Sequence, residues 1–282
     1  FPEDVRATST LEEAVAGAEL VVLAPATHGL RDVCRSVAPL LRPGTSILSA
    51  CKGLEPGTLL RMTQVIAEEL PPAFRDSIAA LSGPSFAVEV GHGLPTATVV
   101  ASEDPGVGRV IQDALMTPRF RVYTNHDVTG VELGGALKNV IAIGVGIAEG
   151  LEVGYNAQAA LITRGLAEIA RLGAAMGAQP LTFAGLSGMG DLVLTCTGEL
   201  SRNRRVGIAL GRGKSLEQAT AGGRMVAEGV RTTLAAYSLA QKLGISTPIT
   251  EQVHHVLFGG RDPREGVMAL MSREKSTEID EY

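Results

Sequence analysis

The chain has 282 residues, of which 45% are hydrophobic and 20% are charged, enough apolar material for one large or two ordinary globular domains. Its net charge is −5 and aromatic residues make up 4% of it. These values argue against a nucleic-acid partner, because such partners are bound by basic surfaces with aromatic stacking platforms. Any phosphate group must therefore be bound by a local cluster of donors.

Cysteine spacing and hydropathy argue against two further classes, cysteine-rich metal or disulfide proteins and membrane-spanning proteins. Cys34, Cys51 and Cys196 have neither metal-ligand nor disulfide spacing, so we expect a reducing compartment and no metal site. The longest uninterrupted apolar run covers residues 140–148, which is much shorter than the roughly 20 residues of a membrane span. We therefore expect no membrane-spanning helix.

Short apolar runs alternate with helical patterns over the first 125 residues. We predict strands at 19–24, 45–50, 77–81, 96–100 and 120–123. Between them, Thr10-x-x-Glu13 is the pattern of a capping box ahead of one helix, and residues 57–70 fit another. Continuously apolar strands separated by helices predict a parallel sheet that is covered by helices on both faces.

The strand signals end near residue 126, and helical patterns follow. The stripe Ile162, Leu166, Ile169 and Gly173, the cap Ser215-x-x-Gln218, the stop Gly244, and the starts Thr247-Pro248 and Asp262-Pro263 are all typical of helices. We therefore predict an α/β domain over residues 1–125 and an all-helical domain over residues 126–282.

Polar segments follow the first three predicted strands, at 25–28, 51–55 and 82–86. Ligands of open parallel sheets bind beyond the carboxyl ends of the strands, so we expect one crevice to collect these segments. In it, Lys52 is placed to contact a phosphate or a carbonyl, although it also fits a solvated turn lysine. The Ser82-to-Ser85 segment precedes a predicted short helix at 86–89, whose N–H groups favour an anion; the alternative is a plain helix cap. We assign no role to His28.

Lys138 is the strongest catalytic candidate. It stands in a predicted helix of small and apolar residues, 130–144, next to Asn139. Desolvation lowers the pKa of a lysine among apolar helices, which suits it to take or give the proton of an alcohol during hydride transfer. The alternative is a lysine that extends to solvent at the helix surface.

Two downstream segments add polar groups. Asp191 ends the Gly-rich segment 185–191, which we expect to be a flexible turn; its carboxylate would orient a lysine, bind a substrate hydroxyl, or simply cap the next helix. Residues 201–205 combine Ser201 as a helix cap with three arginines and Asn203. Arginine grips phosphate with two parallel hydrogen bonds, although a run of charges is also typical of a solvated surface. Together these residues predict a pocket for a small anionic substrate.

At these residues the chain resembles the bacterial NAD(P)-dependent glycerol-3-phosphate dehydrogenases. The motifs that carry the resemblance occur in the family's order and cover nearly the whole chain. They are Lys52-Gly53-Leu54-Glu55, Ser82-Gly83-Pro84-Ser85-Phe86, Gly134-Gly135-Ala136-Leu137-Lys138-Asn139, Gly188-Met189-Gly190-Asp191-Leu192, Thr195-Cys196-Thr197, Ser201-Arg202-Asn203-Arg204 and Glu228-Gly229.

The resemblance implies a role for specific residues. Lys138 would be the general base and acid. The substrate would be surrounded by Lys138, Lys52, Gly83, Ser85, Asp191, Ser201, Arg202 and Asn203, with the last three near its phosphate. The cofactor, NAD or NADP, would be contacted by Lys52, Ala87, Arg202, Val226 and Glu228.

The resemblance also implies an architecture and a setting. It makes residues 1–125 part of a dinucleotide-binding Rossmann domain and residues 126–282 a helical substrate-binding and catalytic domain. Such enzymes are cytoplasmic, commonly homodimeric, and supply glycerol 3-phosphate for phospholipid synthesis. The family opens with a strand, a Gly-rich turn and a helix, and no GxGxxG motif follows a predicted strand here, so we expect this sheet to lack roughly two family strands.

Two other functions fit the same residues. The first is a related two-domain dehydrogenase that acts on a hydroxyacid or a sugar-acid phosphate. The second is a non-catalytic binding scaffold without the nucleotide-gripping half. A substrate panel separates the first alternative, and calorimetry with NADH and NADPH separates the second.

Overall fold

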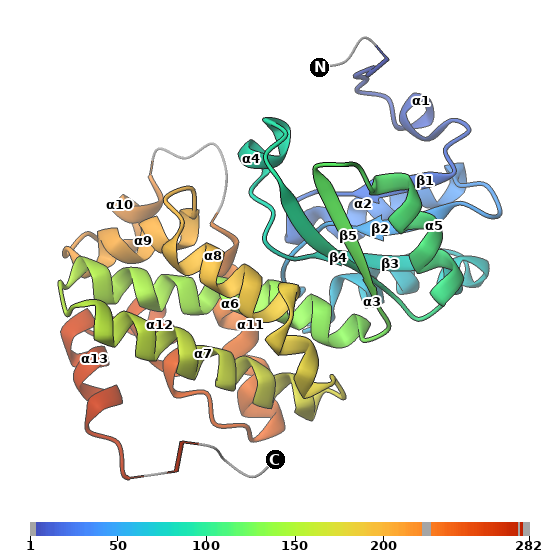
Figure 1. The fold of residues 1–282 in the computed structure, drawn as a ribbon. Helices are drawn as coiled ribbons and strands as arrows, with labels where there is room; N and C mark the ends of the chain where they lie inside the picture. The colour runs from blue at the N-terminus through green and yellow to red at the C-terminus, as the bar shows by residue number, and fades with distance from the viewer. Residues whose placement is uncertain (1–3, 222–226, 276, 279–282) are drawn as a thin grey trace.

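The computed structural model describes residues 4–221, 227–275 and 277–278. Within these ranges five strands form one sheet in chain order (Figure 1). They are β1 (Leu20–Leu23), β2 (Ser46–Ser49), β3 (Ile78–Ser82), β4 (Thr96–Ser102) and β5 (Phe120–Asn125). Each apolar run that we predicted as a strand is a strand, and its ends differ from the prediction by no more than two residues.

The sheet is parallel except at one pairing. β1 pairs with β2, β2 with β3 and β4 with β5 in parallel, whereas β3 and β4 are antiparallel, with Ser82 opposite Val99. The α/β class is confirmed, but the expectation of parallel pairing throughout is wrong at this point. The connection from β3 to β4 holds only the short α4 (Ala87–Gly91), which extends beyond the end of the sheet instead of crossing a face (Figure 1). The chain therefore re-enters the sheet from the same end.

Helices cover both faces of the sheet, as predicted. α2 (Leu30–Val37) and α3 (Met62–Glu69) bury Ile47 and Ile78 on one face, and α5 (Pro105–Leu115) buries Leu48 on the other. Neighbouring residues of a strand point to opposite faces, which is why Ile47 and Leu48 belong to different cores. α1 (Leu11–Val15) precedes the sheet and packs near α2.

Two helix starts differ from the predictions. α3 begins at Met62 instead of residue 57, because Gly57 and Leu59 have φ of 87° and 64° and Arg61 forms a β-bridge with Leu54. The segment before α3 is therefore a turn. The helix after Thr10 forms, but the Thr10 side chain makes no capping hydrogen bond. Instead the hydroxyl of Thr8 donates to the carboxylate of Glu13, at 2.7 Å.

The strands end at Asn125 and helices follow from Val128. They are α6 (Val128–Gly150), α7 (Tyr155–Ala175), α8 (Asp191–Thr197), α9 (Arg202–Gly211), α10 (Leu216–Thr220), α11 (Glu228–Leu243), α12 (Pro248–Phe258) and α13 (Pro263–Met271). Short 3-10 turns lie at Thr27–Gly29, Ala38–Leu40, Pro72–Ser77 and Pro180–Ala184, and a π-helical turn lies at Leu186–Gly190. The predicted cap at Ser215, the stop at Gly244 and the two proline starts are confirmed.

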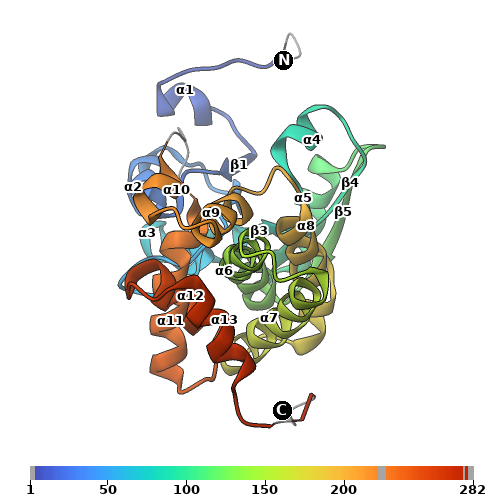
Figure 2. The ribbon, with the colours of Figure 1, turned by 90° about the vertical axis from the view of Figure 1, so that its left-hand side faces the viewer.

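α6 is the central helix of this half, with α7, α8, α9, α11 and α12 around it (Figure 2). Among the described residues it alone has the length and apolar composition of a membrane span, with a mean hydropathy of 1.5. However, 94% of its most apolar window is buried inside the protein, as in the core helix of a globular domain. Its first turns also pack on the sheet, where Val128 and Val131 contact the core around Ala80 and Val99.

Candidate active site

The side chains of Lys138 and Lys52 meet at one buried carboxylate. Lys138 lies in the middle of α6 and is 5% exposed. Its Nζ donates to Oδ1 of Asp191 and, at 2.9 Å, to the hydroxyl of Thr195. Lys52 follows β2, and its Nζ donates to Oδ2 of Asp191 at 2.8 Å and to the carbonyl of Gly83 at 2.9 Å. The surface-lysine alternative for Lys138 and the solvated-turn alternative for Lys52 are therefore both wrong.

A pair of glycines lets these elements converge. A Cβ at Gly134 would lie 2.6 Å from the carbonyl oxygen of Ser187, and a Cβ at Gly135 would overlap the hydroxyl of Ser82. A side chain at either position would force its neighbours to shift, since one side of α6 touches the backbone of the π-helical turn and the adjacent side touches the Ser82 side chain at the end of β3. One turn later on the same helix, Lys138 therefore lies within reach of groups from both sides.

Asp191 is the first residue of α8 and is 1% exposed. The segment before it, expected to be a flexible turn, is a π-helical turn packed so closely that a Cβ at Gly188 would overlap the backbone of Phe183. Such turns occur often at functional sites. Both carboxylate oxygens of Asp191 accept from lysines, so it is not a simple helix cap. Thr195 lies one turn further along α8 and donates to the Asp191 carbonyl at 2.6 Å.

The electrostatics of this cluster bring the pKa of Lys138 close to physiological pH. Burial lowers the pKa of Lys138 to about 8, the positive charge of Lys52 acts in the same direction, and Asp191 partly opposes both. Burial alone would raise the pKa of Asp191, but the two ammonium groups hold it below its usual value. Near neutral pH the carboxylate stays charged, and Lys138 is able to exist with or without its extra proton.

Lys52 stands on a loop that ion pairs hold in place. Glu55 accepts two hydrogen bonds from the guanidinium of Arg31, at 2.8 and 2.7 Å, and a third from the hydroxyl of Thr58 at 2.6 Å. Arg31 pairs with Glu69 as well. The acidic residue of the Lys52-to-Glu55 motif thus fixes the loop that carries the lysine.

The segment after β3 lies beside the lysines. The hydroxyl of Ser85 donates at 3.0 Å to the Gly83 carbonyl, which also accepts from Lys52. Ala87, the first residue of α4, is exposed. Ser82 is 2% exposed, and its hydroxyl has no hydrogen-bond partner.

The polar residues at the start of α9 have different roles: one caps the helix, one forms an ion pair with α6, and one is exposed. Ser201 caps the helix, as predicted, by accepting from the Arg204 N–H at 3.2 Å. Arg204 forms a two-bond ion pair with Glu149, at 2.8 and 2.7 Å. Arg202 is exposed at the first turn of α9. Arg204 therefore has a structural partner on α6.

Asn203 links three helices. Its amide donates to the side-chain oxygen of Asn139 at 2.9 Å, and its own oxygen accepts from the backbone N–H of Gly229 at 3.0 Å. Asn139 is the neighbour of Lys138 on α6. The contacts of Asn139 and Thr195 were missed by the sequence interpretation, although the spacing of Thr195 four residues after Asp191 is a signal that both face the same way on a helix.

The donor set fits a dinucleotide cofactor beside a phosphorylated substrate. Lys52 and Arg202 offer positive charge to phosphate groups, Glu228 at the start of α11 offers a carboxylate to sugar hydroxyls, and the buried hydroxyl of Ser82 has hydrogen bonds to give. Val226, the remaining predicted cofactor residue, lies outside the described residues.

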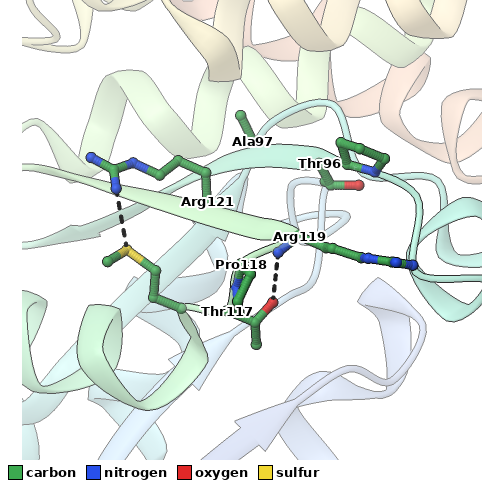
Figure 3. Close-up of a pocket in the computed structure, with 8 residues that line it drawn as sticks. Thr96, Ala97, Thr117, Pro118, Arg119 and Arg121 are labelled. Carbon is green, nitrogen blue, oxygen red and sulfur yellow. Dashed lines mark hydrogen bonds between the residues drawn. The ribbon is translucent and has the colours of Figure 1, made fainter.

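Two surface hollows lie elsewhere. One of about 640 Å³ is formed by the beginnings of β4 and β5 and the turn between α5 and β5. There Arg121 extends toward the sulfur of Met116, and the backbone of Arg119 bonds to the Thr117 hydroxyl (Figure 3). The other, of about 460 Å³, is lined by residues of α6 to α9, including Arg204 and its partner Glu149. Neither contains Lys52, Lys138 or Asp191.

Comparison with known proteins gives consistent results. Residues 1–107 and 127–268 match the N-terminal and C-terminal parts of NAD-dependent glycerol-3-phosphate dehydrogenases. The glycerol-3-phosphate dehydrogenase [NAD(P)+] of Symbiobacterium thermophilum is 56% identical over 281 residues, which is 100% of this chain and 82% of that protein. The crystal structure of the Coxiella burnetii glycerol-3-phosphate dehydrogenase superposes with a TM-score of 0.92 at 41% identity, covering 97% of this chain and 83% of that one.

A more distant likeness concerns the fold alone. A ketopantoate reductase from Ralstonia eutropha is 15% identical, with a TM-score of 0.56 over 91% of this chain and 79% of that one. At this identity the likeness shows a shared fold and does not bear on the substrate.

Proposed function

Because the chain belongs to the NAD-dependent glycerol-3-phosphate dehydrogenase family, we propose that it interconverts sn-glycerol 3-phosphate and dihydroxyacetone phosphate with NAD(H) or NADP(H). The observation that carries the proposal is the buried amine of Lys138, held by Asp191 and Thr195 next to a second amine, that of Lys52. This is an acid–base group inside a cationic cluster, which the oxidation of an alcohol that bears a phosphate requires.

Lys138 moves the proton in this reaction. In the reductive direction its ammonium group gives a proton to the oxygen on C2 of the substrate, and in the oxidative direction its neutral amine takes the hydroxyl proton. When bound, the nicotinamide supplies or accepts the hydride on C2. Asp191 and Thr195 hold the amine of Lys138 in one orientation, and enclosure among apolar helices keeps water from competing for the proton.

The substrate is bound by residues from both halves of the chain. Lys52, Gly83, Ser85 and Asp191 surround its hydroxyl-bearing carbons. The phosphate lies at the start of α9, where Ser201, Arg202 and the second N–H of the Asn203 amide are donors. Arg202 is exposed and stands at the positive end of a ten-residue helix, which supports this placement.

The cofactor contacts Lys52 and Ala87 from the sheet half and Arg202 and Glu228 from the helical half. Lys52 and Arg202 reach both ligands in this arrangement. The proposal is supported by the position of Lys52, which bonds to groups of both halves at once.

A substrate panel tests the function. Purified protein should oxidise NADH or NADPH in the presence of dihydroxyacetone phosphate, followed by absorbance, and should reduce the oxidised cofactor in the presence of sn-glycerol 3-phosphate. Turnover of a 3-hydroxyacid or a sugar-acid phosphate in place of these compounds would contradict the proposal. Absence of NADH and NADPH binding in calorimetry would favour the non-catalytic scaffold.

We also propose a cytoplasmic homodimer that supplies glycerol 3-phosphate for phospholipid synthesis. The family resemblance supports this setting, and the exposed Met268 and Met271 of α13 are apolar surface that a second copy would cover. Sedimentation equilibrium measures the oligomeric state, and a monomer at micromolar concentration would contradict the dimer.

A further inference from the structure

A second buried carboxylate, that of Glu132, joins the two halves of the molecule. Glu132 lies on α6 and is 7% exposed. It accepts from the backbone N–H of Thr63 at 2.8 Å, from the Thr63 hydroxyl at 2.6 Å, and from the guanidinium of Arg61. Thr63 belongs to the first turn of α3, so a helix of the sheet half is tied to the central helix of the other half.

These contacts lead directly to Lys52. Arg61 forms an antiparallel bridge with Leu54, and the N–H of Glu55 donates to the carbonyl of Leu60 at 2.9 Å. These contacts pair the two ends of the segment 54–61 and close it into a loop, and Lys52 lies two residues before that loop's first bridge. Glu132 therefore anchors, through Arg61, the loop of residues 52–61 that carries the lysine at the site.

The chain of contacts closes on itself. Lys52 bonds to Asp191, Asp191 bonds to Lys138, and Lys138 lies six residues after Glu132 on α6. Between them on the same helix, Gly135 lies against the side chain of Lys52, whose Cγ would be 3.7 Å from a Cβ at that position. Helix, carboxylate, loop and lysine form one ring, in which the position of the Lys52 amine depends on Glu132.

We propose that Glu132 is a positioning residue that sets the place of the Lys52 amine relative to Lys138, through its ion pair with Arg61 and its bonds to Thr63. The proposal rests on the proposed function for its kinetic consequences but not for its geometry. Glu132 does not contact the reacting atoms; it acts through Lys52. Without it the loop would lose its charged anchor on α6 and keep the buried side chain of Leu54 in the core around that helix, so Lys52 would be held less firmly against Asp191 and Gly83.

The chain offers a matched control in Glu168. Glu168 is a buried glutamate on α7 that accepts from the backbone N–H groups of Ile249 and Thr250, at 2.6 and 3.1 Å, and from the Thr250 hydroxyl at 3.2 Å. It thus binds the first turn of α12 as Glu132 binds the first turn of α3. The hydrogen bonds of Glu168 go to α12 and not to the loop of residues 52–61, so a merely structural role predicts the same consequences for both residues.

The first experiment compares Glu132→Gln with Glu168→Gln in steady-state kinetics. We expect Glu132→Gln to raise the KM for dihydroxyacetone phosphate about tenfold with a change in kcat below about threefold, because binding by Lys52 is lost while Lys138 remains. Glu168→Gln should keep both constants. Arg61→Met removes the same Arg61–Glu132 ion pair and should also raise KM. This variant replaces Glu132→Gln in the test if Glu132→Gln does not fold.

The second experiment asks whether Glu132 acts through Lys52. In a Lys52→Met background, the additional Glu132→Gln change should alter KM by less than about twofold, since the group it positions is gone. A full tenfold effect in that background would overturn the proposal, as would equal kinetic effects of Glu132→Gln and Glu168→Gln.

The third experiment needs neither substrate nor cofactor. The rate at which acetic anhydride modifies Lys52 in the ligand-free protein is followed by mass spectrometry of its peptide. Glu132→Gln should raise this rate about fivefold or more, because a released loop exposes the amine, and Glu168→Gln should not. Equal Lys52 rates in the two variants would overturn the proposal. A raised rate in a protein that does not turn over dihydroxyacetone phosphate would instead refute the proposed function and leave the positioning role standing.

Discussion

The two halves of the molecule hold their lysines in different ways. In the helical half, Lys138 is built into the middle of α6, enclosed by other helices, and bonded to groups of α8. In the sheet half, Lys52 stands on a loop beyond a strand end, and ion pairs, one bridge and the buried side chain of Leu54 hold that loop. The proton-transfer group therefore owes its pKa to burial, whereas the binding group owes its position mainly to ion pairs around its loop.

The largest effect should come from removing the buried amine. Lys138→Ala should lower kcat by about two or more powers of ten, because the reaction loses its acid–base group. Initial-rate assays with saturating dihydroxyacetone phosphate and cofactor measure this loss of kcat. A variant with near-normal turnover would mean that burial of this lysine serves packing alone, and the contrast between the halves would disappear.

The next largest effect should be the pH dependence of the rate, which should have opposite signs for reduction and for oxidation. Burial lowers the pKa of Lys138 to about 8, so its ammonium form is present below that pH and its neutral form above it. Reduction of dihydroxyacetone phosphate should therefore fall about tenfold per pH unit well above 8, whereas oxidation of glycerol 3-phosphate should rise up to 8 and then level off.

Values of kcat/KM in both directions between about pH 7 and pH 10 test this expectation, because kcat/KM reports the pKa of the free enzyme and the substrate phosphates finish ionising near pH 6. Profiles that move in the same direction for both reactions would argue against Lys138 as the shared acid and base. The Lys138→Ala variant is the control, because its residual rate should lack the step near 8.

A smaller effect is expected from the exposed arginine of α9. Arg202→Ala should raise the KM for glycerol 3-phosphate about tenfold, in line with the loss of a charge-assisted pair, with a much smaller change for glycerol. Lys214→Ala, at an exposed position after α9, is the matched control for lost surface charge. An equal effect of Arg202→Ala on both alcohols would show that it does not bind the phosphate.

Glu168 should affect stability and leave activity unchanged. Burial raises the pKa of Glu168 to about 7, although backbone bonds oppose this shift, so the folded state keeps a proton that the unfolded state releases near its usual value. This contribution to stability is present at low pH and is lost as pH rises through about 7. Relative to Glu168→Gln, the wild type should lose up to about 3 kcal/mol between pH 4.5 and 7.

Urea unfolding of the wild type and Glu168→Gln at several pH values measures the difference. A difference that does not change with pH would mean that Glu168 titrates normally. Unchanged kinetic constants in the same variant are also what the control role of Glu168 requires.

Local sequence patterns predicted the strands well, because buried strands read as short apolar runs that are bounded by polar turns. They failed at the β3–β4 pairing, since the direction of a strand depends on where its connection runs and not on its own residues. In the same way, the turn before α3 looked helical, and only the bridge between Leu54 and Arg61 shows why the helix starts late.

The sequence pointed to Lys138, Lys52 and Asp191 separately, but it did not show the contacts that join them. A lysine among small apolar residues signals burial, which is how Lys138 stood out. Asp191 follows it by 53 positions and Lys52 precedes Asp191 by 139, so no periodicity could reveal that one carboxylate bonds both. Glu132 attracted no attention for the same reason: its partners lie on the other half of the chain, 69 and 71 positions away.

The shared carboxylate has a consequence for proton uptake. Two ammonium groups against one carboxylate leave the trio with a surplus of a single positive charge, so an arriving phosphate dianion finds an unbalanced counter-charge. The negative charge of that dianion raises the pKa of Lys138. Binding of the ketone therefore favours the protonated form of Lys138, which is the form that reduction requires. Association with the ketone should draw hydrogen ions from solution at mildly alkaline pH, a quantity that calorimetry in buffers of different ionisation enthalpy reads directly.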